Sequence, residues 1–192
     1  MKKISRPLRV GFDLDGVILY NPARIIRPIV TGVKRLIMKK RKTSFYIPNT
    51  PFEKFIWYLL HKSSLFVSPG YSEIKKLVKN NSIEAYLITS RYSFLKKDFE
   101  SWKKKLSAET VFVQCFMNEH NEQPHKFKEK MVQSLKLDVF IEDNWDIVEH
   151  LSKKCPDTRI LWIYNIFDRG VTYPYRFNLL NKAVKALSSI VP

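Results

Sequence analysis

The sequence contains little glycine, little cysteine and no long hydrophobic run. Only 5 of its 192 residues are glycine and no low-complexity tract occurs, which argues against a disordered chain. The 2 cysteines lie in no CxxC or cysteine–histidine spacing typical of a metal site, so we expect buried free thiols in a reducing compartment. The longest uninterrupted apolar run, FIWYLL, is far too short to cross a bilayer, and we expect a cytoplasmic protein without a transmembrane segment.

Acidic residues are also scarce relative to basic ones. The chain has 34 Lys and Arg against 18 Asp and Glu, a net charge of +16, which attracts phosphorylated small molecules, nucleic acid or an acidic membrane surface. Residues 20–70 contain ten of these basic residues and a single acid. The stretch KRLIMKKRK at 34–42 allows three interpretations: a solvated face, a surface that steers an anionic substrate or nucleic acid, and a basic helix lying on a membrane.

The apolar pattern predicts an α/β fold. Five short, almost wholly apolar runs are typical of strands buried on both faces: 8–14, 83–89, 110–116, 137–142 and 159–165. Helical patterns separate the last four and close the chain: about 92–106, 124–136, 144–154 and 176–189. Strands that alternate with helices predict a doubly wound, Rossmann-like, parallel five-stranded sheet.

The gap between the first two predicted strands is longer than a crossover connection needs. Residues 72–80 can form the crossover helix, so the remaining residues, 20–70, predict a small helical cap inserted after strand one. The expected division is a core domain of residues 1–19 and 71–192 and a cap subdomain of residues 20–70.

Two helical patterns lie within the predicted cap, at about 27–39 and 51–62. Trp57 and Tyr58 in the second pattern could stack on a base. Aromatic side chains at helical spacing are more often part of a core, however, so both interpretations stay open.

Three of the predicted strands end in polar side chains: Asp13-Leu14-Asp15-Gly16, Thr89-Ser90-Arg91 and Glu142-Asp143-Asn144. Ligands of open parallel sheets bind at the carboxyl ends of the strands, so we expect these groups to meet on one rim. A carboxylate can attack phosphorus and divide one difficult displacement into two easier steps, which makes Asp13 the candidate nucleophile. Asp15, two residues on, is the candidate general acid and base. Mg²⁺ would make such carboxylates compatible with an anionic phosphate.

The motifs DLDGV, LITSR, a lysine-bearing helix and VFIEDN follow one another across nearly the whole chain. In this order they resemble the haloacid dehalogenase-like (HAD) hydrolase superfamily, and the insert resembles its first type of helical cap, C1. LITSR, FIEDN and the short cap look most like the small 5′(3′)-deoxyribonucleotidase-like branch. The resemblance implies a Mg²⁺-dependent phosphomonoester hydrolase that acts through an aspartyl-phosphate. Its implied substrate is a small phosphorylated metabolite such as a nucleoside monophosphate.

The resemblance also implies which residues bind phosphate. Thr89 would donate its hydroxyl to a phosphoryl oxygen, assisted by Ser90 or by backbone amides. Lys128 would neutralise the phosphate, with Lys126 as the alternative. Arg91 would either orient the substrate phosphate or pair with the second acid of FIEDN.

The implied metal ligands are Asp13, the carbonyl of Asp15 and an acid from Glu142 and Asp143. Asp143 is preferred because it matches the second acid of the family pattern. The family often has Gly-Asp where this chain has Ile-Glu before it, so the choice between Glu142 and Asp143 stays open.

Other interpretations of the same residues remain. Asp13 and Asp15 also match the metal-binding DxD of a nucleotide-sugar transferase, or a purely structural pair at a strand end. The chain could instead be a binding module whose basic cap holds nucleic acid or another protein, or a phosphatase acting on nucleic-acid ends. The sequence predicts no oligomeric state.

Overall fold

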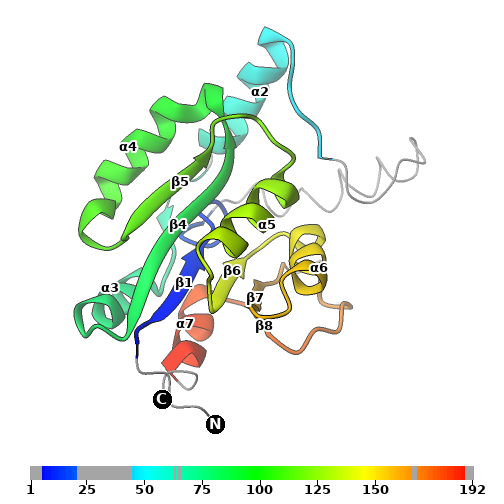
Figure 1. The fold of residues 1–192 in the computed structure, drawn as a ribbon. Helices are drawn as coiled ribbons and strands as arrows, with labels where there is room; N and C mark the ends of the chain where they lie inside the picture. The colour runs from blue at the N-terminus through cyan, green and yellow to red at the C-terminus, as the bar shows by residue number, and fades with distance from the viewer. Residues whose placement is uncertain (1–5, 21–44, 63, 65, 166–167, 189–192) are drawn as a thin grey trace.

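The computed structural model of the chain describes residues 6–20, 45–62, 64, 66–165 and 168–188 (Figure 1). The helix predicted at 27–39 and the basic stretch at 34–42 lie outside the described residues.

Parallel strands form one main sheet at the centre of the molecule. In the described part of the chain it has six strands in the order β5-β4-β1-β6-β7-β8, with β1 in the middle. The strands are Leu8–Phe12 (β1), Ile83–Tyr92 (β4), Gln114–Asn118 (β5), Val139–Glu142 (β6), Arg159–Ile163 (β7) and Arg176–Phe177 (β8). The doubly wound parallel sheet is thus confirmed, with one strand more than predicted.

Some boundaries differ from the predicted ones. Residues 176–177 form the edge strand β8 rather than the start of the closing helix, because they pair with Trp162 and Ile163 of β7. Strand β4 extends through Tyr92, so Arg91 lies within it rather than after it.

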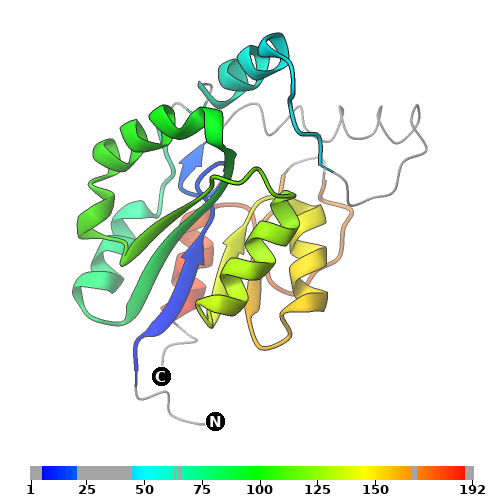
Figure 2. The same ribbon diagram turned by 45° about the horizontal axis from the view of Figure 1, so that its top comes forward.

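Helices cover both faces of this sheet (Figures 1 and 2). They are Tyr71–Lys79 (α3), Lys96–Leu106 (α4), Pro124–Ser134 (α5), Trp145–Lys154 (α6) and Leu180–Ser188 (α7). Helices α3, α4 and α7 pack on one face and α5 and α6 on the other. Strand β4 shows why both faces are covered: Leu87 points into the first layer and Ile88 into the second. Two short 3₁₀ turns, Ser93–Leu95 (η2) and Ala108–Thr110 (η3), flank α4.

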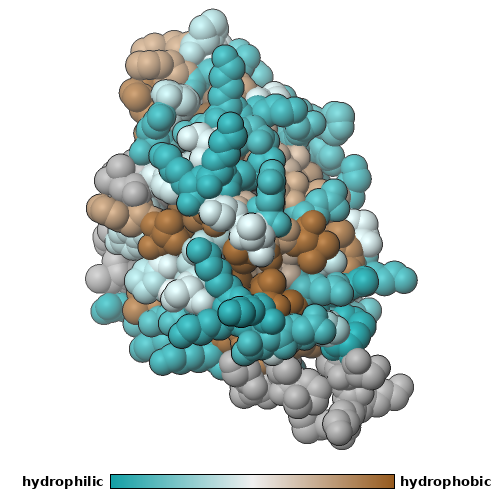
Figure 3. All heavy atoms as spheres, turned by 90° about the vertical axis from the view of Figure 1, so that its left-hand side faces the viewer, coloured by the Kyte–Doolittle hydropathy of each residue, from teal (hydrophilic) through white to brown (hydrophobic). Residues whose placement is uncertain are grey.

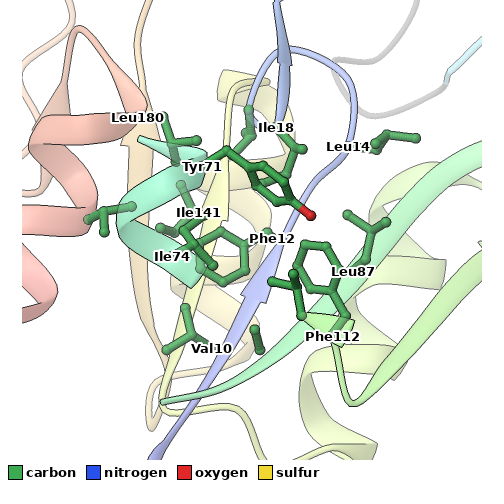
Figure 4. Packing of buried hydrophobic residues seen from close by; sticks show 14 of the residues in the cluster. Val10, Phe12, Leu14, Ile18, Tyr71, Ile74, Leu87, Phe112, Ile141 and Leu180 are labelled. Carbon is green, nitrogen blue, oxygen red and sulfur yellow. The ribbon is translucent and has the colours of Figure 1, made fainter. Parts of the chain in front are cut away.

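The first layer shows how β1 is held. Phe12 lies among Ile74 of α3, Ile141 of β6 and Leu180 of α7 (Figure 4). A strand buried on both faces is rigid, which suits it to present the residues that follow it. No helix among the described residues is both long and apolar enough to span a bilayer.

The described ends of the predicted cap lie side by side. Strands Leu19–Tyr20 (β2) and Phe66–Val67 (β3) pair antiparallel, so the chain leaves and re-enters the core at neighbouring positions. Helix Pro51–Lys62 (α2) coincides with the predicted pattern and lies beyond the ends toward which the strand arrows point (Figure 2). Thr50 Oγ1 accepts from the Glu53 amide at 3.2 Å, and Glu53 accepts from the Thr50 amide at 2.9 Å, which forms a capping box.

Candidate active site

Four carboxylates gather where β1 and β6 end. The amide of Asp13 donates to the carbonyl of Ile141 at 3.0 Å, which aligns the two chain segments just past the last strand pairing. Asp13, Asp15, Glu142 and Asp143 are all buried, between 0% and 6% exposed. The rim predicted from the strand ends therefore exists.

Gly16 allows the chain to turn beside these acids. Its φ of +86° lies in the left-handed region, and a Cβ at this position would overlap the Asp143 carboxylate. Only glycine combines this backbone conformation with such a close approach.

Lys128 of α5 lies beside the candidate nucleophile. Its Nζ is 3.0 Å from Asp13 Oδ1 and 2.5 Å from Glu142 Oε2, and the residue is 2% exposed. Lys126 instead has a largely exposed side chain that pairs with Glu129 at 3.2 Å. Of the two predicted lysines, the structure thus brings Lys128 to the acids.

Burial and crowding shift the protonation of this cluster. Burial raises the pKa of Asp13 well above its usual value; Lys128 opposes the shift, while Glu142 and Asp143 add to it. Burial likewise raises the pKa of Glu142, and the charge of Lys128 again acts to lower it. One ammonium group therefore does not fully compensate three crowded carboxylates.

The same crowding matches the requirements of a metal ion. Asp13, Glu142 and Asp143 each offer a carboxylate oxygen, and these three atoms lie within 4.8 Å of one another. Mg²⁺ prefers oxygen ligands, which these carboxylates supply. They also carry negative charge that Lys128 alone does not neutralise. Both Glu142 oxygens already accept hydrogen bonds, Oε2 from Lys128 and Oε1 from the backbone amides of residues 143 and 144. This favours Asp143 over Glu142 as the acid nearest a metal.

Arg91 forms a clamp on Asp15. Its Nε and Nη2 each donate to one oxygen of the Asp15 carboxylate at 2.7 Å, and its Nη1 donates to Asp98 Oδ2 at 2.5 Å. Its side chain is 0% exposed. The expected pairing with Asp143 is wrong, since the partners are Asp15 and Asp98. The other predicted role of Arg91, a contact with the substrate phosphate, stays a prediction.

The clamp holds Asp15 in its ionised form. Burial pushes the pKa of Asp15 upward, but the paired and hydrogen-bonded Arg91 outweighs burial and holds that pKa well below its usual range. Asp13 and Asp15 thus have opposite shifts although they are two residues apart, as groups with separate roles in one site often do.

Thr89 and Ser90 lie in β4 just beyond its last pairing with β1, Leu87 with Phe12. Thr89 is 1% exposed, and its Oγ1 accepts from the amide of Arg91 at 3.3 Å. The hydroxyl of Ser90 is buried and finds no hydrogen-bond partner within the part of the chain that the structure describes. An unused buried donor at this rim is available to a ligand oxygen.

Comparisons with known proteins give the fold its name. No family model matches the chain. A nucleotidase of Clostridium acetobutylicum is 28% identical over 163 residues, which are 76% of this chain and 76% of that protein. Solved structures of other proteins superpose on almost the entire chain. A HAD hydrolase of family IA, variant 3, from Entamoeba histolytica superposes with a TM-score of 0.59 at 11% identity, covering 94% of this chain and 99% of that one. The chain has the haloacid dehalogenase-like hydrolase fold.

Two further structures with this HAD-like fold resemble the chain. A HAD-superfamily hydrolase from Ehrlichia chaffeensis has a TM-score of 0.56 at 14% identity, over 98% of this chain and 100% of that one. CbbY from Rhodobacter sphaeroides, solved in complex with phosphate, has a TM-score of 0.57 at 10% identity, over 91% and 95%. The resemblance inferred from the motifs is therefore confirmed for the fold, while the deoxyribonucleotidase-like branch and the residue roles stay predictions.

Several residues around the acids of this HAD-like core were missed from the sequence. Ser64 Oγ donates to Asp15 Oδ1 at 2.9 Å, and His61 Nε2 lies 4.0 Å from Asp15 Oδ2. Lys62 Nζ lies 3.9 Å from Asp98 Oδ1. The end of α2 thus meets the Arg91 clamp at both of its acids. Asp98 could have been noticed as the acid in the first turn of α4, whereas nothing in the local sequence marks His61 or Ser64.

Proposed function

We propose that this protein is a Mg²⁺-dependent phosphomonoester hydrolase that acts through an aspartyl-phosphate formed on Asp13. The observation that carries the proposal is the contact of Lys128 with Asp13 at 3.0 Å inside a buried acidic cluster at the end of the central strand. A carboxylate, a cation and a set of metal-ligating oxygens are the parts that phosphoryl transfer to an enzyme carboxylate requires.

In the first step an Asp13 oxygen attacks phosphorus and the ester oxygen leaves with a proton. In the second step water attacks the aspartyl-phosphate, its proton passes to Asp15, and inorganic phosphate leaves Asp13 free. The clamp by Arg91 supports the second role of Asp15, because an ionised carboxylate can accept that proton. Donating a proton in the first step requires a protonated Asp15, and hence a looser clamp. When bound, Mg²⁺ would offset the repulsion between these carboxylates and the phosphate.

Lys128 would contact the transferred phosphoryl group, with Thr89 and Ser90 as hydroxyl donors. Arg91 is assigned to positioning Asp15 rather than to the phosphate. Asp143, with Asp13 and the Asp15 carbonyl, would hold the metal. The described parts of residues 20–70 would act as a cap over a core formed by residues 1–19 and 71–192.

A nucleoside monophosphate is the substrate that we propose, because the curated relative is a nucleotidase. Trp57, whose ring centroid lies 6.5 Å from that of His61 and 5.9 Å from that of Tyr46, offers an aromatic face for a base one turn from the end of α2 that reaches Asp15. Action on nucleic acid through the basic cap and a cytoplasmic location stay predictions, and the basic stretch lies outside the described residues.

The test is phosphate release from p-nitrophenyl phosphate and from a panel of nucleoside monophosphates, 3′- and 5′-phosphorylated oligonucleotides and other phosphorylated metabolites. We expect turnover that requires Mg²⁺, stops with EDTA and is lost in Asp13→Asn. Turnover that survives both EDTA and Asp13→Asn would contradict the mechanism, and a preference for oligonucleotides would contradict the substrate class.

A further inference from the structure

Helix α2 turns a histidine toward Asp15. The exposed side of the helix is apolar, with Phe52 72% and Phe55 56% exposed. Figure 3 shows tan and brown spheres at the top of the molecule, where α2 lies. His61 lies about 180° around the helix from Phe52, and its side chain is only 14% exposed. The side of α2 that faces the core therefore presents an imidazole to the candidate acids.

The ring of His61 lies between two acceptors. Its Nδ1 is 3.0 Å from the carbonyl oxygen of Trp57, and because a carbonyl oxygen only accepts, Nδ1 carries a proton. Its Nε2 is 4.0 Å from Oδ2 of the Asp15 carboxylate. The doubly protonated imidazolium suits both neighbours, and Nε2 is then the atom that holds a proton beside Asp15.

The two oxygens of Asp15 have different partners. Oδ1 accepts from Arg91 Nη2 at 2.7 Å and from Ser64 Oγ at 2.9 Å, which uses both of its lone pairs. Oδ2 accepts from Arg91 Nε at 2.7 Å and is the oxygen that lies near His61. Proton exchange at this carboxylate is therefore expected at Oδ2, on the side of His61 Nε2.

The separation of Nε2 and Oδ2 suits one oxygen atom in contact with both. At 4.0 Å it is too long for a direct hydrogen bond. An oxygen about 2.8 Å from each of the two atoms, the usual hydrogen-bond length, fits this separation. The ester oxygen that leaves phosphorus in the proposed reaction is such an atom, because it needs a proton beside Asp15.

We propose that His61 is the catalytic residue that donates this proton, an inference that rests on the phosphatase mechanism proposed above. In the first step the bond between phosphorus and the ester oxygen breaks, its electron pair stays on that oxygen, and the oxygen takes the proton of His61 Nε2. In the second step water attacks the aspartyl-phosphate, and its proton passes through Asp15 Oδ2 to Nε2. One ester and one water have then become an alcohol and inorganic phosphate, and His61 has its proton again.

This role removes a difficulty of the Arg91 clamp. Donation of the first proton by Asp15 requires the clamp to loosen, whereas donation by His61 leaves Asp15 ionised and paired with Arg91. The neighbouring Lys62 is not placed to replace His61, since its Nζ lies 3.9 Å from Asp98 and its side chain is 55% exposed. Because the acid comes from α2, departure of the alcohol requires the end of this helix to lie against the core.

The test uses two esters whose leaving oxygens differ in their need for a proton. p-Nitrophenolate leaves as a stable anion because its charge spreads onto the nitro group, whereas the phenolate released from phenyl phosphate is more basic. In His61→Ala we expect kcat/KM for phenyl phosphate to fall by about 10²-fold and that for p-nitrophenyl phosphate to change much less. His120→Ala, which alters an exposed histidine outside the site, should leave both values unchanged.

His61→Gln is a second variant that keeps a polar side chain of similar size. Its amide can donate a hydrogen bond but cannot give up the proton, so it should show the same selective loss, with circular dichroism confirming that each variant is folded. Equal losses for the two esters in folded variants, or no loss for either, would overturn the role of His61 while the wild type, active with Mg²⁺ and inactive as Asp13→Asn, still supports the proposed function. A wild type that hydrolyses neither ester with Mg²⁺ would overturn the proposed function and the role of His61 with it.

Discussion

At the scale of single residues, the site depends on two buried basic groups with different duties. Lys128 lies between Asp13 and Glu142, whereas Arg91 lies between Asp15 and Asp98. The lysine is placed to meet a phosphate, and each of the three nitrogens of the arginine guanidinium donates to a carboxylate. Removal of one should act mainly on catalysis, and removal of the other on folding.

The first prediction concerns Lys128→Met. Loss of the only cation that contacts Asp13 among the described residues should lower kcat/KM for p-nitrophenyl phosphate by about 10²–10³-fold, as for other groups that stabilise transition-state charge. Lys126→Met, on the same helix but largely exposed, is the matched control and should change little. Steady-state kinetics on folded protein measures both, and equal losses would refute the assignment.

The second prediction concerns Arg91→Met. The change leaves Asp15 and Asp98 buried without their partner, so the free energy of unfolding should fall by about 3–5 kcal/mol. The exposed Arg169, changed to Met, should cost little. Urea unfolding followed by circular dichroism gives both values; a loss below about 1 kcal/mol for Arg91→Met would show that the clamp is dispensable.

At the scale of elements, the turn after β1 and the end of β6 form a single unit. Asp13 through Leu19 turn back on themselves, with the Gly16 amide donating to the Leu19 carbonyl at 2.8 Å and the Leu19 amide donating to the Leu14 carbonyl at 2.8 Å. Within this turn, the backbone at Gly16 lies so close to Asp143 that a Cβ on it would overlap the Asp143 carboxylate. The geometry of the acids is therefore coupled to the backbone of this turn.

The third prediction concerns Gly16→Ala. The positive φ alone should lower the free energy of unfolding by about 1–2 kcal/mol once the residue has a Cβ. The Cβ must also displace the Asp143 carboxylate, so both stability and Mg²⁺-dependent activity should fall. Gly170→Ala is the control, because a Cβ there meets nothing within 4 Å. Thermal unfolding and activity are measured on both proteins; indistinguishable results would contradict this role of Gly16.

At the scale of the whole molecule, the buried acids make stability depend on pH in two directions. The pKa of Asp15 is lowered in the fold, so its contribution is present above its unfolded pKa of about 3.9 and is lost as pH falls further. The pKa values of Asp13 and Glu142 are raised, so their contribution is present at acid pH and is lost as pH rises through the raised values. Near neutral pH the ionised carboxylates of the acidic cluster therefore lower the free energy of unfolding.

The fourth prediction follows for metal binding. Mg²⁺ binds ionised carboxylates and competes with protons for them, so it should raise the melting temperature more at about pH 7.5 than at about pH 5, where a larger fraction of carboxylates with raised pKa values is protonated. Asp143→Asn should remove most of the shift at the higher pH. Thermal unfolding with Mg²⁺ or EDTA at both pH values measures it, and a larger shift at the lower pH would contradict the linkage.

Much of this fold was predictable because its signals are local. Apolar runs of strand length alternate with helical patterns, and the helix 51–62 was predicted to the residue. The carboxyl ends of parallel strands share one edge of a sheet, so Asp13 and Asp143 could be placed together from their positions alone. The two-residue strand β8 was missed because so short a segment has no pattern of its own.

The sequence by itself determined the α/β architecture and the acidic rim, because both depend on the order of residues along the chain. Only the tertiary structure decided that Lys128 rather than Lys126 reaches Asp13, since residues two apart on a helix point to different sides and packing selects one of them. It also decided that Arg91 clamps Asp15, and that His61 of α2 and Ser64 just after this helix lie against the same carboxylate. These pairings join residues distant in sequence, and they form because a buried charge is stable only beside a partner that the completed fold brings to it.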